Sequence, residues 1–407
     1  MSSRRERRYR KPLWRLLTSG FIVATGLAVA LGFLAQTGRA GDEANKALEG
    51  ISFSTVAYID YSNGQTPVDG GKTKDYNQFK LTRGYFTLKK KITPWLGMRL
   101  TTDLTQDATG DYKVRQKYFY AELRPNDQGP LTDMVAEVGL GHVPWLDFEE
   151  RINPYRCQGT MAIERADVFN SADMGISLRG NIAGKLADPD KRTGNSQYAG
   201  RYGSWHFGVY NGGGYNAPEN NENKAIEGRL TFRPLPDVVP GLQLSYFGVF
   251  GKGNAYSASL KDYPDYMVNL GMVSFEHPKI NLTAQYFATK GNAKGTWIDS
   301  LKTKDALSTQ GFSFFGNVHL PGTEDRLSAF GRLDYFDIDR DHVLADKTAY
   351  VMSLGGLAYR LYQENMVLLT YEATEFEKDV ANKGKLPTRG YNAKDDQRVQ
   401  AVFQLAF

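Results

Sequence analysis

Charged side chains recur at alternate positions in segments that otherwise hold apolar or small residues. In residues 96–105, for example, Arg99 and Asp103 alternate with Leu and Met. Because alternate side chains of a strand share one face, we expect such charges to line one face of a sheet. The set expected on that face comprises Arg83, Arg99, Arg179, Arg229 and Arg332 with Asp103, Glu122, Glu137, Glu227 and Asp334. Its positive and negative charges balance.

Charges of opposite sign on one wet face can act in two ways. They can brace the wall by neutralising each other, or they can form a rung of charge across an opening that discriminates between ions. Arg99 with Asp103, and Glu227 with Arg229, are the pairs that the spacing suggests. Both interpretations stay open for each pair.

A second concentration of charge lies in residues 144–173, between two strand-like segments. Loops of this length without structure of their own are usually functional or disordered. Pro144 and Pro154 restrict the backbone of this segment. Its candidate functional charges are Arg151, Arg156 and Arg165 with Glu149, Glu164 and Asp167, and it also carries Asp147, Glu150 and Asp173. We expect these charges to hold the segment against a wall or to form a transverse field; the alternative is a surface loop with solvated charges.

Residue types that support catalysis or metal binding lack the necessary spacing. The five histidines are scattered without metal-ligand intervals. Asp337, Asp339 and Asp341 match the start of a calcium loop, but His342 and Thr348 stand where Gly and Glu are required. A single cysteine, Cys157, excludes a disulfide scaffold. We therefore predict no catalytic residue, no metal site, no cofactor and no enzymatic activity.

In the segments that carry these charges, apolar residues alternate with polar or small ones. A period of two is typical of strands with one apolar face. Sixteen strands are predicted, at 51–62, 78–89, 95–105, 113–124, 133–143, 174–184, 201–211, 225–233, 241–251, 265–275, 280–290, 309–319, 326–337, 347–359, 364–374 and 397–407. The connections alternate between short ones and long ones such as 62–77 and 375–396. The polar stretch 185–200 is long where a short turn is expected, so it is either an elaborated turn or a missed strand that would raise the count to eighteen.

A soluble β-sandwich and a transmembrane β-barrel share this alternation. Four features favour the barrel: an export signal, strands close to the 9–11 residues that a tilted span needs, aromatic residues near strand ends, and a last strand that finishes in Phe407. The aromatic residues expected in interfacial girdles are Tyr58, Tyr61, Tyr118, Tyr120, Trp205, Tyr210, Tyr246 and Phe250. The fold class predicted is an all-β, antiparallel transmembrane barrel with a long loop folded into the pore.

Residues 1–40 have the pattern of a signal peptide. A basic stretch, Arg4–Arg15, precedes an apolar run, Phe21–Leu34, and a small-residue site ends at Ala40. The run is short for a membrane anchor, which is the alternative. This segment holds eight Lys and Arg against one Glu, leaving 42 Lys and Arg against 44 Asp and Glu, so the overall charge of +5 does not indicate nucleic-acid binding. Residues 41–50 are predicted to be a periplasmic leader, and 51–407 the barrel.

Several motifs occur along the chain: Gly139-Leu-Gly-His-Val-Pro-Trp145, Glu149-Glu150-Arg151, Ile163-Glu164-Arg165, Asp173-Met-Gly-Ile-Ser-Leu-Arg-Gly180, Lys80–Leu88, Val209–Gly213, Gly228–Pro234 and Arg332–Phe336. Taken together, they resemble the phosphate-selective porin O and P family. The resemblance covers most of the chain from residue 51. It implies a sixteen-stranded, trimeric outer-membrane porin with a loop in the pore. Because the expected lumen charges balance, we do not carry over phosphate selectivity.

Two functions are consistent with a polar-lined barrel. The favoured one is a porin for passive diffusion of small hydrophilic solutes or ions. The alternative is a sleeve around a multihaem cytochrome in an electron-transfer conduit. The partners expected are outer-membrane lipid, lipopolysaccharide and two further copies of the chain, with multihaem cytochromes in the sleeve alternative only.

Overall fold

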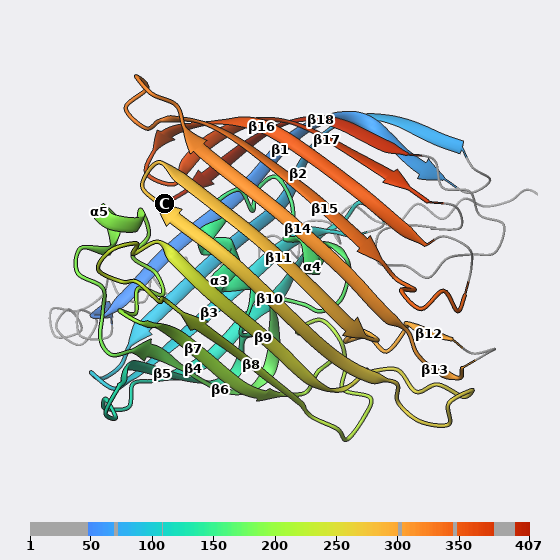
Figure 1. The fold of residues 1–407 in the computed structure, drawn as a ribbon, viewed down its shortest axis with the longest axis horizontal. Helices are drawn as coiled ribbons and strands as arrows, with labels where there is room; N and C mark the ends of the chain where they lie inside the picture. The colour runs from blue at the N-terminus through green and yellow to red at the C-terminus, as the bar shows by residue number, and fades with distance from the viewer. Residues whose placement is uncertain (1–47, 69–71, 108, 300–302, 345–347, 378–394) are drawn as a thin grey trace, which may run out of the picture. The chain divides into compact units, whose positions relative to one another are not determined.

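The alternating segments form a closed antiparallel β-barrel (Figure 1). The computed structural model describes residues 48–68, 72–107, 109–299, 303–344, 348–377 and 395–407. The predicted signal peptide and most of the predicted leader lie outside the described residues. The chain divides into two units, Met1–Ile51 and Ser52–Phe407, and the second unit is the barrel.

Within the described residues, sixteen strands take part in the barrel, as the sequence predicts. Their bounds are β1 (Ile51–Val68), β2 (Lys72–Lys91), β3 (Leu96–Gln106), β4 (Tyr112–Leu123), β5 (Leu131–His142), β6 (Ala172–Ile182), β7 (Gly203–Tyr210), β8 (Ala225–Phe232), β9 (Leu242–Lys252), β10 (Asp265–His277), β11 (Ile280–Lys290), β14 (Ser308–His319), β15 (Leu327–Asp337), β16 (Ala349–Tyr362), β17 (Asn365–Phe376) and β18 (Asp396–Ala406). Each pairs with its neighbours along the chain, and β1 pairs with β18, with Val56 opposite Ala406. A short pair, β12 (Ile298–Asp299) and β13 (Asp305–Ala306), lies in the connection before β14.

The structure corrects the prediction for the connection 62–77 and decides between the two alternatives for 185–200. Most of 62–77, predicted as a loop, belongs to β1 and β2, because this hairpin continues with polar residues that the apolar alternation does not reveal. The stretch 185–200 contains no strand; it is an elaborated turn with the short helix α5 (Pro189–Thr193). The sixteen-strand count therefore holds, and the eighteen-strand alternative is wrong.

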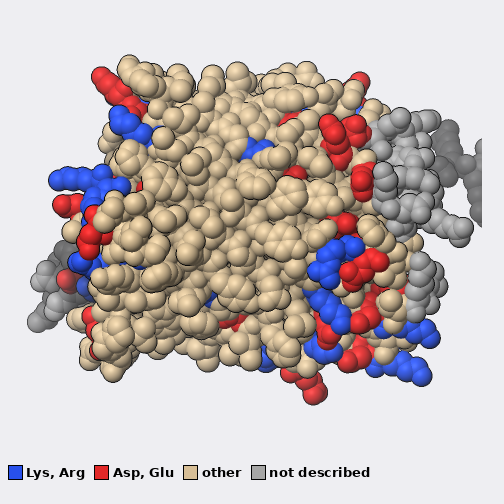
Figure 2. All heavy atoms as spheres, in the orientation of Figure 1, with Lys and Arg blue, Asp and Glu red and all other residues tan. Residues whose placement is uncertain are grey.

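The two faces of the barrel wall differ in chemistry. On β9, Leu244, Tyr246 and Phe250 are exposed on the outside, while Ser245 and Phe247 are buried on the inside. Figure 2 shows charged side chains gathered at the two ends of the barrel, with few of them on the band between. An apolar outer band is what a barrel in lipid requires, whereas a soluble sandwich would bury it. No helix in the described part of the chain is long and apolar enough to cross a membrane.

Candidate functional site

The connection between β5 and β6, residues 143–171, is the inserted segment, and it packs against the inside of the barrel. It contains α3 (Leu146–Ile152) and α4 (Ala162–Arg165), both visible within the barrel in Figure 1. The ring of Trp145, fully buried, lies 5.7 Å from that of Phe247 on β9, and Tyr155 stacks on Phe330 of β15 at 4.1 Å. These contacts form one hydrophobic core inside the barrel, built from the segment and from inward side chains of β8 to β18 and of β1.

The buried carboxylate of Glu149 makes two polar contacts within this core. It accepts hydrogen bonds from Trp145 Nε1 and from Gln285 Nε2 of β11, both at 2.7 Å. Burial raises the pKa of Glu149 to about 7, and the hydrogen bonds and the charge of Arg332 offset only part of that rise. Glu149 therefore ties α3 to the wall and does not face open water.

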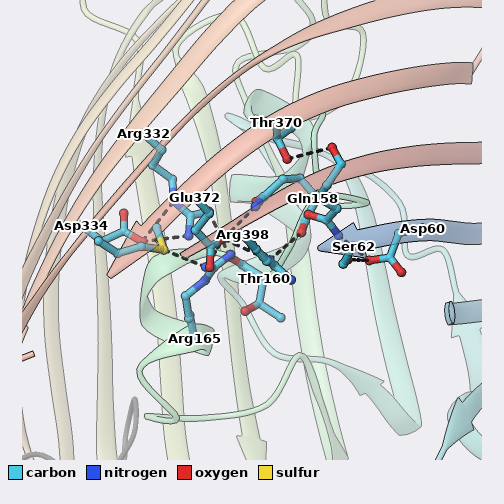
Figure 3. A network of polar contacts seen from close by, with 12 residues as sticks. Asp60, Ser62, Gln158, Thr160, Arg165, Arg332, Asp334, Thr370, Glu372 and Arg398 are labelled. Carbon is cyan, nitrogen blue, oxygen red and sulfur yellow. Dashed lines mark hydrogen bonds and ion pairs between the residues drawn. The ribbon is translucent and has the colours of Figure 1, made fainter. Parts of the chain in front are cut away.

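Glu372 on β17 is the centre of a second contact (Figure 3). Its Oε2 accepts from Arg165 at 2.7 Å, from Gln158 at 2.8 Å and from Arg398 at 3.0 Å. Next to it, Arg332 pairs with Asp334 at 2.8 Å and donates to the carbonyl of Thr160 at 3.0 Å. Arg165 of the inserted segment and Arg332 of β15 thus link the segment to the wall, and the role of the segment's charges in ion discrimination stays a prediction.

The other candidate charges of the inserted segment have separate partners. Arg156 pairs with Glu150 at 2.8 Å and lies 3.5 Å from Glu164. Arg151 lies 3.7 Å from Asp147, one turn earlier on α3. Asp167 pairs with Lys294, from the connection after β11, at 2.7 Å. The predicted charges of this segment are therefore spread over several contacts and do not form one row.

The wall formed by β2 to β6 carries a different set of charges. Asp103 is buried between Arg83, at 3.0 Å, and Arg115, at 2.7 Å. The predicted pair of Arg99 with Asp103 does not form, because four residues along a strand span about 13 Å, whereas Arg115 lies directly opposite Asp103 on β4. Arg99 instead contacts His142 Nε2 at 3.2 Å.

A neighbouring cluster surrounds Glu137 on β5. Glu137 pairs with His142 at 2.9 Å and with Arg179 of β6 at 3.4 Å. Glu122, the remaining acid predicted for this wall, pairs with Arg124. The side chains of Arg83, Arg115 and Arg179 stay 24%, 29% and 30% exposed, so their charges reach the lumen even though each has an acidic partner.

The predicted pair of Glu227 with Arg229 on β8 is also absent among the described residues. Arg229 donates to Ser204 Oγ at 3.0 Å and to Thr231 Oγ1 at 2.6 Å, and its guanidinium lies 4.2 Å from the ring centre of Phe148 on α3. Glu227 is buried, and its Oε2 has no hydrogen-bond partner. Arg229 therefore contacts the Phe148 ring and the hydroxyl groups of Ser204 and Thr231, and not the predicted carboxylate of Glu227.

The sequence pattern places several tyrosines on the wrong face of the wall and misses one lysine on the inner face. Tyr58, Tyr118, Tyr120 and Tyr210 were expected in the outer girdles but are buried inside the barrel, whereas Tyr246 and Phe250 face outward as predicted. Lys117 Nζ lies 4.5 Å from the ring centre of Tyr85. A bulge explains part of the error: Thr101 and Thr102 are opposite Tyr118 and Gln116, so Lys117 is an extra residue that shifts the alternation.

Two pockets open beside the inserted segment. One, of about 290 Å³, is lined by Lys80, Arg83, Arg156 and Arg398 with polar residues, and no Asp or Glu occurs among its described lining residues. The other, of about 270 Å³, contains Arg151, Arg326 and Arg360 against a single acid, Asp325. Both pockets are therefore richer in positive than in negative side chains.

Metal binding finds no support in the described residues. They contain no group of three or more His, Cys, Asp or Glu side chains placed to hold an ion. Asp337 and Asp339, from the calcium-like spacing, are buried and bonded within their own loop: Asp337 accepts from Thr348 Oγ1 at 2.7 Å, and Asp339 accepts from the amide of Leu344 at 2.6 Å.

The barrel resembles solved structures of outer-membrane proteins, porins among them. The anion-selective porin from Comamonas acidovorans aligns with a TM-score of 0.58 at 10% identity, over 88% of this chain and 100% of that chain. OmpF of Salmonella typhi, in complex with daunomycin, aligns at 0.55 and 11%, over 87% and 97%. The trimer form of OmpT from Vibrio cholerae aligns at 0.52 and 9%, over 88% and 100%.

These likenesses establish the fold, because sequence identity near 10% carries no more than that. No protein-family model matches the sequence, and a search of curated proteins finds no relative. The porin fold is therefore confirmed, whereas the resemblance to the phosphate-selective porin O and P family is not.

Proposed function

We propose that this chain is an outer-membrane porin, a water-filled channel for passive diffusion of small hydrophilic solutes or ions. The observation that carries the proposal is a closed barrel with an apolar outer band and an inner wall bearing Arg83, Arg115 and Arg179. Charged side chains that stay partly exposed on the inside of a barrel require water there. The inserted segment, residues 143–171, narrows the lumen.

A preference for anions follows from the two pockets beside the inserted segment. Lys80, Arg83, Arg156 and Arg398 line one pocket, and Arg151 lies in the other. Positive side chains at a constriction raise the local concentration of anions. The sequence predicts a lumen of balanced charge. These two pockets are more positive than that, because several acids of the lumen, such as Asp103, are buried beneath their arginine partners.

The test is current through the full-length protein in a planar bilayer under a KCl gradient. We expect open-channel currents and a reversal potential displaced toward that of chloride. Lys80→Gln and Arg151→Ala should each lower the anion-to-cation permeability ratio by about twofold, while Lys261→Gln, at an exposed loop position, should leave it unchanged. A folded barrel that inserts without carrying current contradicts the channel, and unchanged ratios in both variants contradict the anion preference.

We also propose that the channel assembles as a homotrimer in contact with outer-membrane lipid and lipopolysaccharide. The family resemblance implies three copies, and the aligned OmpT structure is a trimer form. Chemical cross-linking in detergent should give a ladder that ends at three copies; one that ends at a single copy contradicts the trimer. The cytochrome sleeve is unsupported, because the inserted segment of the chain itself occupies the inside of the barrel.

A further inference from the structure

The elaborated turn between β6 and β7, residues 183–202, is the second segment that reaches α3. It follows an even-numbered strand, so it starts from the same end of the barrel as the short turn at 278–279, whereas the inserted segment starts from the opposite end. We call it the turn insert. Two segments that enter from opposite ends therefore meet at α3.

The base of the turn insert is fixed to neighbouring turns. Arg192 donates to the carbonyl of Pro236 at 2.8 Å. Gly194, at a φ of 75°, packs so closely on Pro278 that an added Cβ would lie 3.0 Å from its Cα. Positive φ and close approach together favour glycine at this position. The turn insert is thus a braced element and not a free loop.

The tip of the turn insert contacts α3 through Tyr198. The Tyr198 hydroxyl donates to Asp147 Oδ2 at 2.6 Å, and its ring meets the Phe148 ring edge-on at 5.4 Å. The Arg229 guanidinium lies 5.0 Å from the centre of the Tyr198 ring. Tyr198 has a φ of 51°, which is costly for a bulky residue and persists only where surrounding contacts demand it.

Asn195 makes the second contact with α3. Its Nδ2 donates to the carbonyl of Arg151 at 3.3 Å and to Glu276 of β10 at 2.6 Å. The Arg151 carbonyl belongs to the last turn of α3, where the final carbonyls lack partners within the helix. Asn195 therefore links the end of α3 to the barrel wall.

The helix α3 depends on such external contacts. It has seven residues and no side-chain hydrogen bond at its N-cap, and helices of this length are marginal on their own. Trp145 and Glu149 attach it to β9 and β11, while Asp147 and Arg151 bear the contacts with the turn insert. The two sets of contacts hold α3 from two sides.

We propose that the turn insert is a latch, in which Tyr198 and Asn195 are positioning residues that fix α3 at the constriction and so suppress spontaneous closures of the channel. This inference rests on the proposed channel function. When the latch contacts are lost, α3 is held only by the wall core and moves within the lumen. The average conductance of the open state is then kept, while closures become frequent.

The test compares single-channel records of wild type, Tyr198→Phe and Asn195→Ala. Since a hydrogen bond to a charged group typically contributes enough to change an equilibrium about tenfold, Tyr198→Phe should raise the closing frequency by roughly that factor. Tyr202→Phe, on the same turn insert but with its ring exposed, is the matched control and should behave as wild type.

Thermal unfolding of each variant, followed by gel mobility, separates gating from a general loss of folding. We expect the unfolding temperature of Tyr198→Phe to stay near that of wild type. The latch is wrong if wild type conducts but both Tyr198→Phe and Asn195→Ala close as rarely as Tyr202→Phe. The proposed channel is unaffected by that result. If wild type itself carries no current, the failure lies in the proposed function.

Discussion

The inside of the barrel has two regions of opposite chemistry. From β9 to β16 the inward side chains include Phe247, Leu270, Phe315 and Phe330, and the inserted segment covers them. From β2 to β6 the inward side chains include arginines, carboxylates and tyrosines, several of which stay partly exposed. One region resembles the core of a soluble protein, and the other resembles a wet surface.

This difference shows how a wide barrel can hold a loop in a defined place. Charges alone fix a loop weakly, since exposed ion pairs contribute about 0–1 kcal/mol each. A hydrophobic core inside the lumen contributes more, because each large buried side chain adds roughly 1.5–3 kcal/mol. The apolar half therefore positions the inserted segment, and the charged half is left to face solutes.

The largest expected effect is the loss of the internal core by Trp145→Ala. The side chain is fully buried, and Trp→Ala in a core costs about 3–5 kcal/mol. The temperature at which the barrel unfolds in detergent should fall accordingly. Trp95→Ala, at a position 58% exposed in the turn after β2, is the control and should change little. Equal effects at both sites would mean that the apolar half does not anchor the segment.

A somewhat smaller effect on the free energy of unfolding is expected from the ionisation of Glu149. Its pKa is about 7 in the folded chain against an ordinary value near 4.5, so the folded state binds a proton more tightly than the unfolded state. The contribution of Glu149 to stability should thus be largest below pH 4.5 and fall by roughly 3 kcal/mol as pH rises to about 7.

Glu149→Gln should remove this contribution and so flatten the decline of the unfolding temperature between pH 4.5 and 7. Glu324→Gln, whose side chain is 83% exposed, should retain it. A pH profile of Glu149→Gln that matches wild type would show that this carboxylate does not titrate within the core.

The smallest effect concerns Glu372, where the two regions meet. Glu372→Gln removes the charge that Arg165 and Arg398 share, at a cost of about 2 kcal/mol. The same change frees positive charge beside the basic pocket, so the anion-to-cation ratio should rise. Glu375→Gln, outward on the same strand, is the matched control for unfolding and for reversal potential. A lower anion preference in Glu372→Gln would contradict the assignment of this region.

The barrel could be predicted from sequence, since alternation is a local signal that each strand carries by itself. The partners of the inserted segment could not. Arg165 and Glu372 are 207 residues apart, and their meeting depends on barrel closure. Phe247 and Phe330 share the inward face with polar residues, so alternation alone gives no reason to expect a core there. The missed Lys117 follows from a bulge, which local periodicity does not register.

The pairing of β1 with β18 has a consequence for biogenesis. These strands are the furthest apart in the chain, yet ten residue pairs, from Val56 with Ala406 to Gln65 with Gln397, join them. Until β18 is present, both β1 and β17 expose open hydrogen-bonding edges, which lipid does not tolerate and other chains can capture. Insertion into the bilayer must therefore wait for the last strand to arrive, or another protein must shield those edges in the meantime.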